Sequence, residues 1–274
     1  MAEKASDAGR SRHASDTVVM SIRDINVFSA SGRQLVFDMS VDVVDRSVTA
    51  IIGQSGTGKS VFVSAIGGVL PDDCRVSGSV LYLGVDIYSL AAMRGGEWRR
   101  EIMVVPQYPT VLPCSIYDNV AIPLRYWQRR SRVLRPSRKV AELDGAVEKA
   151  LTRAALWAEV RDRLREPASV LSAGQKQRLC IARALALEPR MLIFDEPTAH
   201  LDPISAAKLE ELVDDLRTEL AMVVVTHSMA EAARISQKTA FLSLGTLVET
   251  GPTEEIFMNP RDARTQDYVT GRTG

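Results

Sequence analysis

The stretch GQSGTGKS at residues 53–60 constrains the fold of this chain more than any other feature. It fits the pattern GxxxxGK[ST], in which Gly53, Gly58, Lys59 and Ser60 occupy the fixed positions. Glycine lets the backbone curl so that successive N–H groups point at an anion. A helix that begins directly after such a loop adds its own unpaired N–H groups and the positive end of its dipole. The pattern therefore predicts a phosphate-binding loop.

The residues on either side of the loop support this prediction. The apolar, β-branched run VTAII at 48–52 predicts a buried strand, and VFVSAIGGVL at 61–70 predicts a helix. A glycine turn that arose by chance would not need a strand before it and a helix after it. In such a loop Lys59 reaches the β- and γ-phosphates, and the Ser60 hydroxyl ligates Mg²⁺. The other residues expected to line the nucleotide are Gln54, Ser55, Gly56, Thr57 and Val61.

The hydrophobic pattern elsewhere predicts an α/β protein. Residues 18–45 alternate apolar and polar residues in short runs, which indicates half-buried antiparallel strands. MLIFDE at 191–196 and MVVVTH at 222–227 are apolar runs on either side of an amphipathic helix at 204–220. Two such runs separated by a helix predict a parallel sheet covered on both faces. Residues 117–165 have a mostly helical pattern.

Composition excludes several classes of function. Lys+Arg and Asp+Glu both number 34, so the net charge is zero and a chain-wide basic field for nucleic acid is absent. The basic run at 129–139 is interpreted as a solvated loop between helices rather than a binding patch. No stretch approaches the 18 or more consecutive apolar residues that predict a membrane span.

The N-terminus and the cysteines point to a cytosolic chain. Residues 1–17 are small and polar and lack the apolar run of a secretory signal, so we expect a disordered tail. The cysteines are scattered and odd in number, which favours reduced thiols over a disulfide framework. They are Cys74, Cys114 and Cys180.

The run MLIFDE supplies two candidate carboxylates. Asp195 stands at the end of the predicted strand, where it can hold Mg²⁺ through water. Glu196 follows it and is placed to polarise an attacking water. An apolar run that ends in acids is a weak signal alone, but downstream of a phosphate loop it is a strong one.

Two further stretches are weaker on their own. LSAGQKQR at 171–178 opens a predicted helix, where Ser172 and the backbone around Gly174 offer an anion-friendly start; a plain N-cap explains them equally well. His227 follows a buried strand. A lone histidine is usually structural, but this one stands where open α/β sheets place ligand-contacting groups.

Taken in order, these stretches resemble the nucleotide-binding subunits of ATP-binding cassette (ABC) transporters. The order is the phosphate loop, VVPQ with Gln107, LSAGQ, MLIFDEPTAHLD and VTHS, and it covers nearly all of the chain from about residue 18. The resemblance implies a P-loop NTPase (RecA-like) core with an antiparallel β subdomain. It also implies an inserted α-helical subdomain at about 108–185 within a cassette of residues 18–274.

The same resemblance implies a mechanism and the residues that perform it. Two copies would close head to tail around two ATP molecules with Mg²⁺, each ATP lying between Lys59 of one copy and the LSAGQ stretch of the other. Glu196 would act as general base, His227 would contact the γ-phosphate, and Gln107 would contact Mg²⁺ or the water. The remaining implied site residues are Phe28 against adenine, Ser172, Gly174 and Gln175 in LSAGQ, and Asp202 between the two sites.

A narrower resemblance concerns the substrate. PCSIYDNVAIPLR at 113–125 and the C-terminal GPTEEIFMNPRDARTQDYVTGRTG at 251–274 resemble phosphate-import ATPases of the PstB type. This implies an importer at the cytoplasmic face of the membrane. The implied partners are permease subunits and, indirectly, an extracytoplasmic substrate-binding protein.

The chain also departs from the family pattern. Ala173 replaces the usual first glycine of LSGGQ, Val61 replaces a threonine, Lys176 replaces a glutamine, and His200 replaces a small residue. These departures leave two alternatives open, an ATPase for another anion or small solute and a diverged paralogue with low activity. An ABC ATPase that works on ribosomes or DNA is disfavoured by the single phosphate loop and the absence of sustained heptads.

Overall fold

The computed structural model describes residues 17–89, 92, 96–130 and 140–272. The stretch 1–16 of the expected N-terminal tail lies outside the described residues, as does 131–139 of the basic run. Thr17, the last residue of that expected tail, is placed. Its carbonyl accepts a hydrogen bond of 2.8 Å from the Asp45 N–H.

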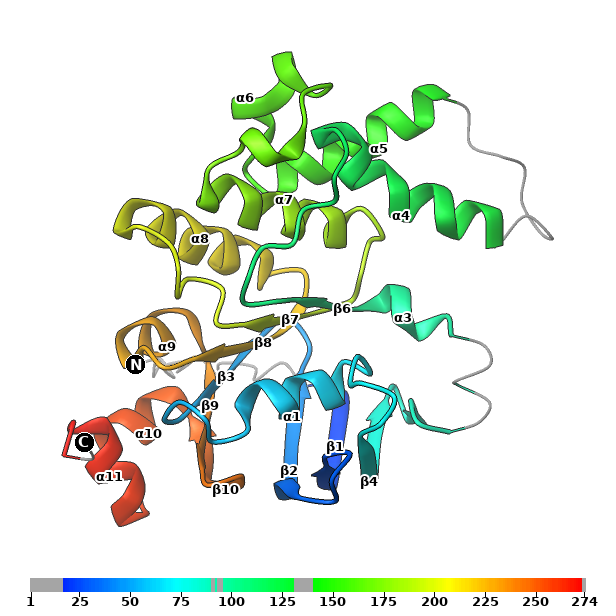
Figure 1. Ribbon diagram of the computed structural model, residues 1–274. Helices are drawn as coiled ribbons and strands as arrows, with labels where there is room; N and C mark the ends of the chain where they lie inside the picture. Colours follow the sequence, from blue (N-terminus) through cyan, green and yellow to red (C-terminus); the bar gives the residue numbers. More distant parts are fainter. Residues whose placement is uncertain (1–16, 90–91, 93–95, 131–139, 273–274) are drawn as a thin grey trace, which may run out of the picture.

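A mixed sheet forms the centre of the protein (Figure 1). Its strands are β1 (Val18–Phe28), β2 (Gln34–Val44), β3 (Val48–Ile52), β4 (Arg75–Tyr82), β5 (Val85–Asp86), β6 (Ile102–Val105), β7 (Met191–Asp195), β8 (Ala221–Thr226), β9 (Lys238–Ser243) and β10 (Thr246–Pro252). Among the described residues they run in the order β5-β4-β1-β2-β10-β9-β3-β8-β7-β6. Strands β9, β3, β8, β7 and β6 pair in parallel, whereas β5, β4, β1 and β2 pair antiparallel. The predicted division into a parallel core and antiparallel N-terminal strands is confirmed.

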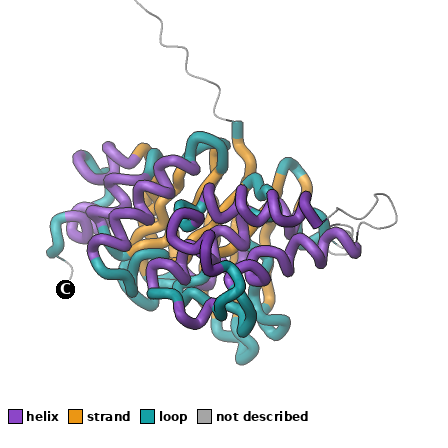
Figure 2. The backbone as a smooth tube through the Cα atoms, turned by 90° about the horizontal axis from the view of Figure 1, so that it is seen from above, coloured by secondary structure: helices purple, strands orange, loops and turns teal. Residues whose placement is uncertain are grey.

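Helices cover both faces of the parallel strands. The α-helices of the described residues are α1 (Lys59–Ile66), α3 (Trp98–Glu101), α4 (Ile116–Arg130), α5 (Val140–Arg153), α6 (Trp157–Val160), α7 (Ala173–Leu185), α8 (Pro203–Leu216), α9 (Met229–Ile235), α10 (Thr253–Met258) and α11 (Ala263–Val269). In Figure 1, α8 and the group α4 to α7 lie above the strands and α1 lies below them. Figure 2 looks down on the upper side and shows these helices overlying the strands. Residues 117–165, predicted to be mostly helical, contribute α4, α5 and α6 within the part that the structure describes.

The alternation of side chains along each strand explains the two layers. On β7, Leu192 and Phe194 point into a cluster with α4, α5, α7 and α8, while Met191 and Ile193 point into a cluster with α1, β1 and β2. All four side chains are fully buried. A strand that buries both faces needs a continuous apolar run, and for that reason MLIF carries no polar residue.

Helix α1 begins and ends earlier than its predicted range of 61–70. It starts at Lys59 and ends at Ile66, where Gly67 forms the C-cap and Gly68 turns to a φ of +62°. The early start places Lys59 and Ser60 in the first helical turn. Both side chains therefore lie at the helix N-terminus, the end that attracts anions.

The register of the parallel strands brings the predicted site residues to one edge of the sheet. Ile52 of β3 lies opposite Thr226 of β8, and Asp195 of β7 lies opposite Val225 of the same strand. The phosphate loop, Glu196 and His227 follow these strand ends directly. In open α/β sheets this edge is where ligands bind.

Candidate active site

The phosphate loop leaves β3 through a glycine that no other residue could replace without strain. Gly53 has a φ of +153°, and a Cβ built there would lie 2.2 Å from the Leu242 carbonyl oxygen of β9. Gly58 closes the loop with a φ of +89°, and a Cβ there would lie 2.8 Å from the Leu35 carbonyl oxygen of β2. The loop is thus pressed against two strands at its two ends, and this close approach depends on the missing side chains.

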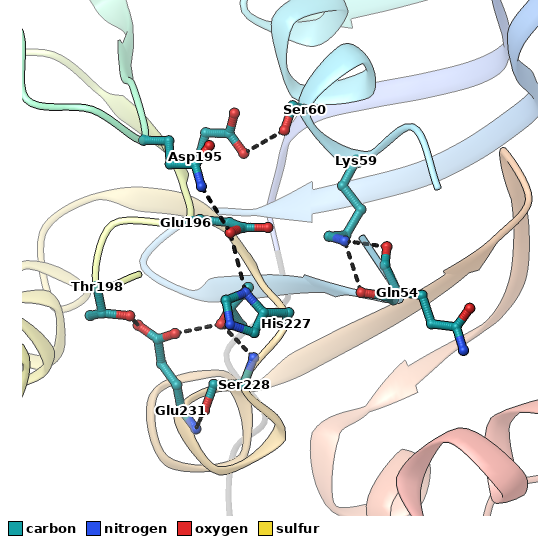
Figure 3. A network of polar contacts seen from close by, with 12 residues as sticks. Gln54, Lys59, Ser60, Asp195, Glu196, Thr198, His227, Ser228 and Glu231 are labelled. Atoms are coloured by element: carbon teal, nitrogen blue, oxygen red, sulfur yellow. Dashed lines mark hydrogen bonds and ion pairs between the residues drawn. The ribbon is translucent and has the colours of Figure 1, made fainter. Parts of the chain in front are cut away.

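Lys59 closes the loop from inside. Its side chain is 4% exposed, and its Nζ donates hydrogen bonds of 2.8 Å to the Gly53 carbonyl and 2.7 Å to the Gln54 carbonyl (Figure 3). Burial lowers the pKa of Lys59, while the carboxylates of Glu196 and Asp195 oppose that shift. An ammonium has three donors, so one N–H remains for an anion.

A hydroxyl and a carboxylate face each other beside this loop. Ser60 Oγ donates a 3.0 Å hydrogen bond to Asp195 Oδ1 (Figure 3). Burial raises the pKa of Asp195, and the bond from Ser60 opposes that rise. Hard oxygen donors such as these fit Mg²⁺, which usually takes one or two protein ligands and fills its shell with water and substrate phosphates. The described residues contain no group of three or more His, Cys, Asp or Glu side chains that could hold a metal ion by itself.

Glu196 meets two of the other predicted residues. Its Oε2 lies 3.1 Å from Gln107 Nε2 and 3.2 Å from His227 Nδ1, so the ends of β6, β7 and β8 converge on one carboxylate. The Glu196 side chain is 14% exposed and the His227 side chain is 54% exposed. Glu196 has a φ of +44°, and its N–H bonds the Val225 carbonyl at 2.9 Å. A non-glycine residue in this region is strained, and such strain gathers at functional sites.

A buried glutamate that the sequence analysis did not single out holds the neighbourhood of His227. Glu231 of α9 is 2% exposed and accepts hydrogen bonds from Thr198 Oγ1 at 2.9 Å and from Thr226 Oγ1 (Figure 3). Thr226 Oγ1 in turn accepts from the Ser228 N–H at 2.9 Å. Burial raises the pKa of Glu231. The network ties the segment after β7 to the strand end that carries His227.

The LSAGQ stretch forms the start of α7. Ser172 accepts a 3.3 Å bond from the Gln175 N–H, and Gln175 Oε1 accepts a 3.0 Å bond from the Ser172 N–H, which makes a capping box. A Cβ built at Gly174 would lie 2.7 Å from Ser205 Oγ of α8. The hydrogen bonds described for Ser172 and Gln175 stay within α6 and α7, so within one copy these residues do not join the phosphate loop.

Glu159 of α6 supports that helix start from the side. Its carboxylate accepts a 2.8 Å bond from Arg178 and a 2.9 Å bond from Gln175 Nε2. Arg178 is 8% exposed and also donates to the Ala155 carbonyl. The bond from Arg178 is the main cause that lowers the pKa of Glu159.

The last two predicted residues lie at the ends of their own elements. Phe28 ends β1, pairs with Gln34 and Arg75, and has the Arg75 guanidinium 5.7 Å from the centre of its ring. Asp202 caps α8 and accepts bonds of 3.1 Å from the Ile204 N–H and 3.0 Å from the Ser205 N–H. Hydrogen bonds from Ser205 and Ile204 lower the pKa of Asp202.

A tyrosine from the C-terminal segment also reaches the loop. Tyr268 of α11 is 8% exposed and stacks on Phe241 of β9 with 4.7 Å between ring centres. It packs in one apolar cluster with Ile52, the residue before the loop. Burial raises the pKa of Tyr268, and the backbone amide of Gly53 opposes that rise. Sequence reasoning used this segment only for its resemblance, because a single tyrosine in a short helix carries no spacing pattern.

Comparison with known proteins agrees with this architecture. A family model described as ABC transporter matches residues 36–199, which is more than half of the 274 residues, and the chain belongs to that family. The chain is also similar to the solved structure of cbiO1 from Clostridium perfringens, described as part of the ABC transporter complex cbiONQ. The two share 25% sequence identity with a TM-score of 0.73 over 94% of this chain and 97% of that one.

Family membership makes this chain an ABC cassette with the ATP-binding site of an ABC transporter ATPase subunit. The P-loop α/β core, the antiparallel strands and the helices α4 to α7 are the parts of that cassette. Within the described residues, no helix combines the length and the apolar character needed to cross a bilayer.

Replacing Gly53 with alanine should destabilise the protein by more than about 3 kcal/mol, because the unusual φ and the overlap with a backbone carbonyl add together. Gly84→Ala is the matched control, since Gly84 has a φ of +81° and nothing within 4 Å of its Cβ position. We expect the control to lose only about 1–2 kcal/mol from its left-handed backbone. Urea unfolding measures both, and equal losses would contradict the close approach at Gly53.

The Glu159–Arg178 pair predicts a pH dependence. The pKa of Glu159 is lowered in the folded protein, so its contribution to stability is present above its unfolded value of 4.5 and disappears as pH falls through the folded value. Glu159→Gln should lose about 1–3 kcal/mol at pH 7, where a charge-assisted bond is removed. The gap between parent and variant in urea unfolding should shrink below pH 4.5. A gap that stays constant with pH would rule out the ion pair as its source.

Proposed function

We propose that two copies of this chain bind and hydrolyse ATP between them and so drive a permease that imports inorganic phosphate. The observation that carries the ATPase part is the convergence of Lys59, the Ser60–Asp195 pair and the Gln107–Glu196–His227 group at one sheet edge. Each group meets a different need of phosphoryl transfer, a process that depends on positioning and on charge. The importing role rests on the C-terminal resemblance.

Lys59 and the loop would bind the phosphates of ATP. The Lys59 ammonium donates hydrogen bonds to the carbonyls of Gly53 and Gln54. These bonds hold its positive charge inside the loop, beside the N-terminus of α1. A polyphosphate entering the loop would meet this ammonium, the loop N–H groups and the helix dipole together. The charge would then be neutralised by a group that is already in place.

Ser60 and Asp195 would hold Mg²⁺, and Gln107 would contact the ion or the attacking water. When bound, the ion neutralises charge on the β- and γ-phosphate oxygens. The Ser60 hydroxyl and the Asp195 carboxylate are 3.0 Å apart and belong to the first turn of α1 and the end of β7. Two short elements in a packed core therefore set the position of the metal site.

Glu196 would act as the general base. Its carboxylate would take a proton from water as the water oxygen forms a bond to the γ-phosphorus and the bond to the bridging oxygen of ADP breaks. The bonds of 3.1 Å to Gln107 and 3.2 Å to His227 orient Oε2 at the edge of the sheet. His227, which is more exposed than Glu196, would then contact the γ-phosphate.

The second copy would complete each site. Ser172 is exposed at the start of α7, Gln175 is half-buried and Gly174 is buried against Ser205 of α8. The hydrogen bonds of Ser172 and Gln175 stay within their own helix start and Glu159, so this end of α7 would face an ATP bound to another copy. Asp202 would lie in the segment between the two sites, and Phe28 would stack on adenine. The helical subdomain, at about 108–185, would carry this helix start toward the partner's nucleotide.

Phosphate import places the chain at the cytoplasmic face of a membrane, bound to permease subunits that receive substrate from an extracytoplasmic binding protein. No nucleic acid takes part. A different solute is the second candidate, because the cassette is similar over 94% of its length to cbiO1, part of a different ABC transporter complex. The C-terminal segment 251–274, by its resemblance to phosphate-import ATPases, favours phosphate.

Glu196→Gln should abolish turnover while leaving ATP binding intact, because the amide keeps the shape of the side chain and cannot accept the proton. We expect a loss of at least about 100-fold in ATP hydrolysis. The variant should accumulate as an ATP-bound dimer, which size-exclusion chromatography with light scattering can detect. Unchanged turnover in this variant would show that Glu196 is not the base.

Uptake of labelled phosphate tests the substrate. Cells that lack their own phosphate-import ATPase but keep its permease would receive either this chain or its Glu196→Gln variant. We expect uptake with the parent chain and none with the variant. ATP turnover by the purified chain without phosphate uptake would assign the cassette to another solute.

A further inference from the structure

Two exposed rings stack beside the candidate active site, and the proposed chemistry uses neither. The Tyr108 and His200 rings lie 4.5 Å apart between centres with an angle of 19° between their planes. Tyr108 directly follows Gln107 after β6, and His200 lies four residues beyond Glu196 after β7. Tyr108 is 65% exposed, so the core does not hold its ring in place. The described contact of the Tyr108 ring is its stack on His200.

The two segments are consequently joined at two points. The first is the 3.1 Å bond from Gln107 to Glu196, and the second is the ring stack. The first joint is temporary, because Glu196 must turn to the attacking water and Gln107 to the metal or the water during the proposed reaction. The second joint uses no group that the reaction needs. It can therefore persist while the first one opens.

The Tyr108 segment is also fastened on its other side. The Thr110 carbonyl accepts a 2.9 Å bond from Arg183 Nη2 and a 3.6 Å bond from Cys180 Sγ, both on α7. Helix α7 begins with the LSAGQ stretch. The residues from Gln107 to Thr110 thus form a short bridge from α7 to the segment that carries Glu196.

His200 lies in the segment that follows β7, as Tyr108 lies in the segment that follows β6. Two residues before it, Thr198 is held by Glu231, and two residues after it, Asp202 caps α8. The His200 ring is therefore carried by a segment that hydrogen bonds hold in place on both sides. Stacking on such a support restricts Tyr108, and through the adjacent peptide bond it restricts where the Gln107 side chain can go.

We propose that Tyr108 and His200 form an aromatic latch that keeps Gln107 beside Glu196 while Gln107 exchanges partners, with His200 as a positioning residue. This inference rests on the proposed ATPase function. The interaction free energy of a stacked aromatic pair corresponds to about 2- to 10-fold in an equilibrium constant, which sets the size of effect expected when the latch is removed. His200, a departure from the small residue usual in the family, thereby has a function of its own in this chain.

A spectroscopic measurement tests the latch without reference to turnover. The chain contains three histidines, so imidazole proton signals are few, and His200→Phe assigns the signal of His200. Stacking on Tyr108 should shift the His200 ring protons upfield. Tyr108→Ala should return them to the position of a free imidazole. His200 signals that do not move in Tyr108→Ala would overturn the latch.

A double-mutant cycle tests its role in the reaction. Tyr108→Ala and His200→Ala should each lower kcat for ATP hydrolysis about 2- to 10-fold with little change in KM, and the double variant should be no slower than the slower single one. His200→Phe keeps a stacking ring and should restore kcat. Tyr126→Ala, at a 57% exposed tyrosine of α4, is the matched control and should match the parent.

The outcomes separate this inference from the function on which it rests. Losses that multiply in the double variant, or no rescue by phenylalanine, would overturn the positioning role. A parent chain that hydrolyses no ATP would instead overturn the proposed function, and the shift of the His200 signals would still decide whether the latch exists.

Discussion

The register of the parallel strands is the constraint on which the rest of this structure depends. Because β3, β7 and β8 pair with their ends level, the phosphate loop, Glu196 and His227 leave the sheet at the same edge. A shift of one residue would turn alternate side chains to the opposite face and move these groups apart. Apolar side chains buried on both faces prevent such a shift. The packing of the core therefore also fixes the geometry of the site.

At this edge of the sheet, the folded chain places opposite charges near each other before any ligand binds. Lys59 is buried on carbonyls, with Asp195 and Glu196 close enough to act on its pKa. The carboxylates are supported in turn, Asp195 by Ser60 and Glu196 by Gln107 and His227. Preorganised groups of this kind need little rearrangement when charge develops during a reaction. The free energy gained by packing the apolar strands offsets the unfavourable free energy of burying these charged groups.

Much of this could be predicted from the residues, and the failures have two different causes. The strand at 48–52 was predicted with its observed bounds, since an apolar β-branched run before a glycine loop has few alternatives. The start of α1 was predicted two residues too late, because Lys59 and Ser60 look like part of the loop. Glu231 and Tyr268 were missed. Neither belongs to a spaced motif, and each matters only because the fold brings it to the site.

The amino-acid sequence by itself determined the phosphate-loop pattern, the α/β class and which polar residues follow the buried strands. Those properties depend on local spacing and hydrophobic periodicity, which can be read along the chain. The tertiary structure alone decided that Glu196 meets Gln107 and His227 and that Tyr108 stacks on His200. These contacts join residues from 31 to about 90 positions apart along the chain, so they depend on strand order and register, and these are set by the packing of the whole core.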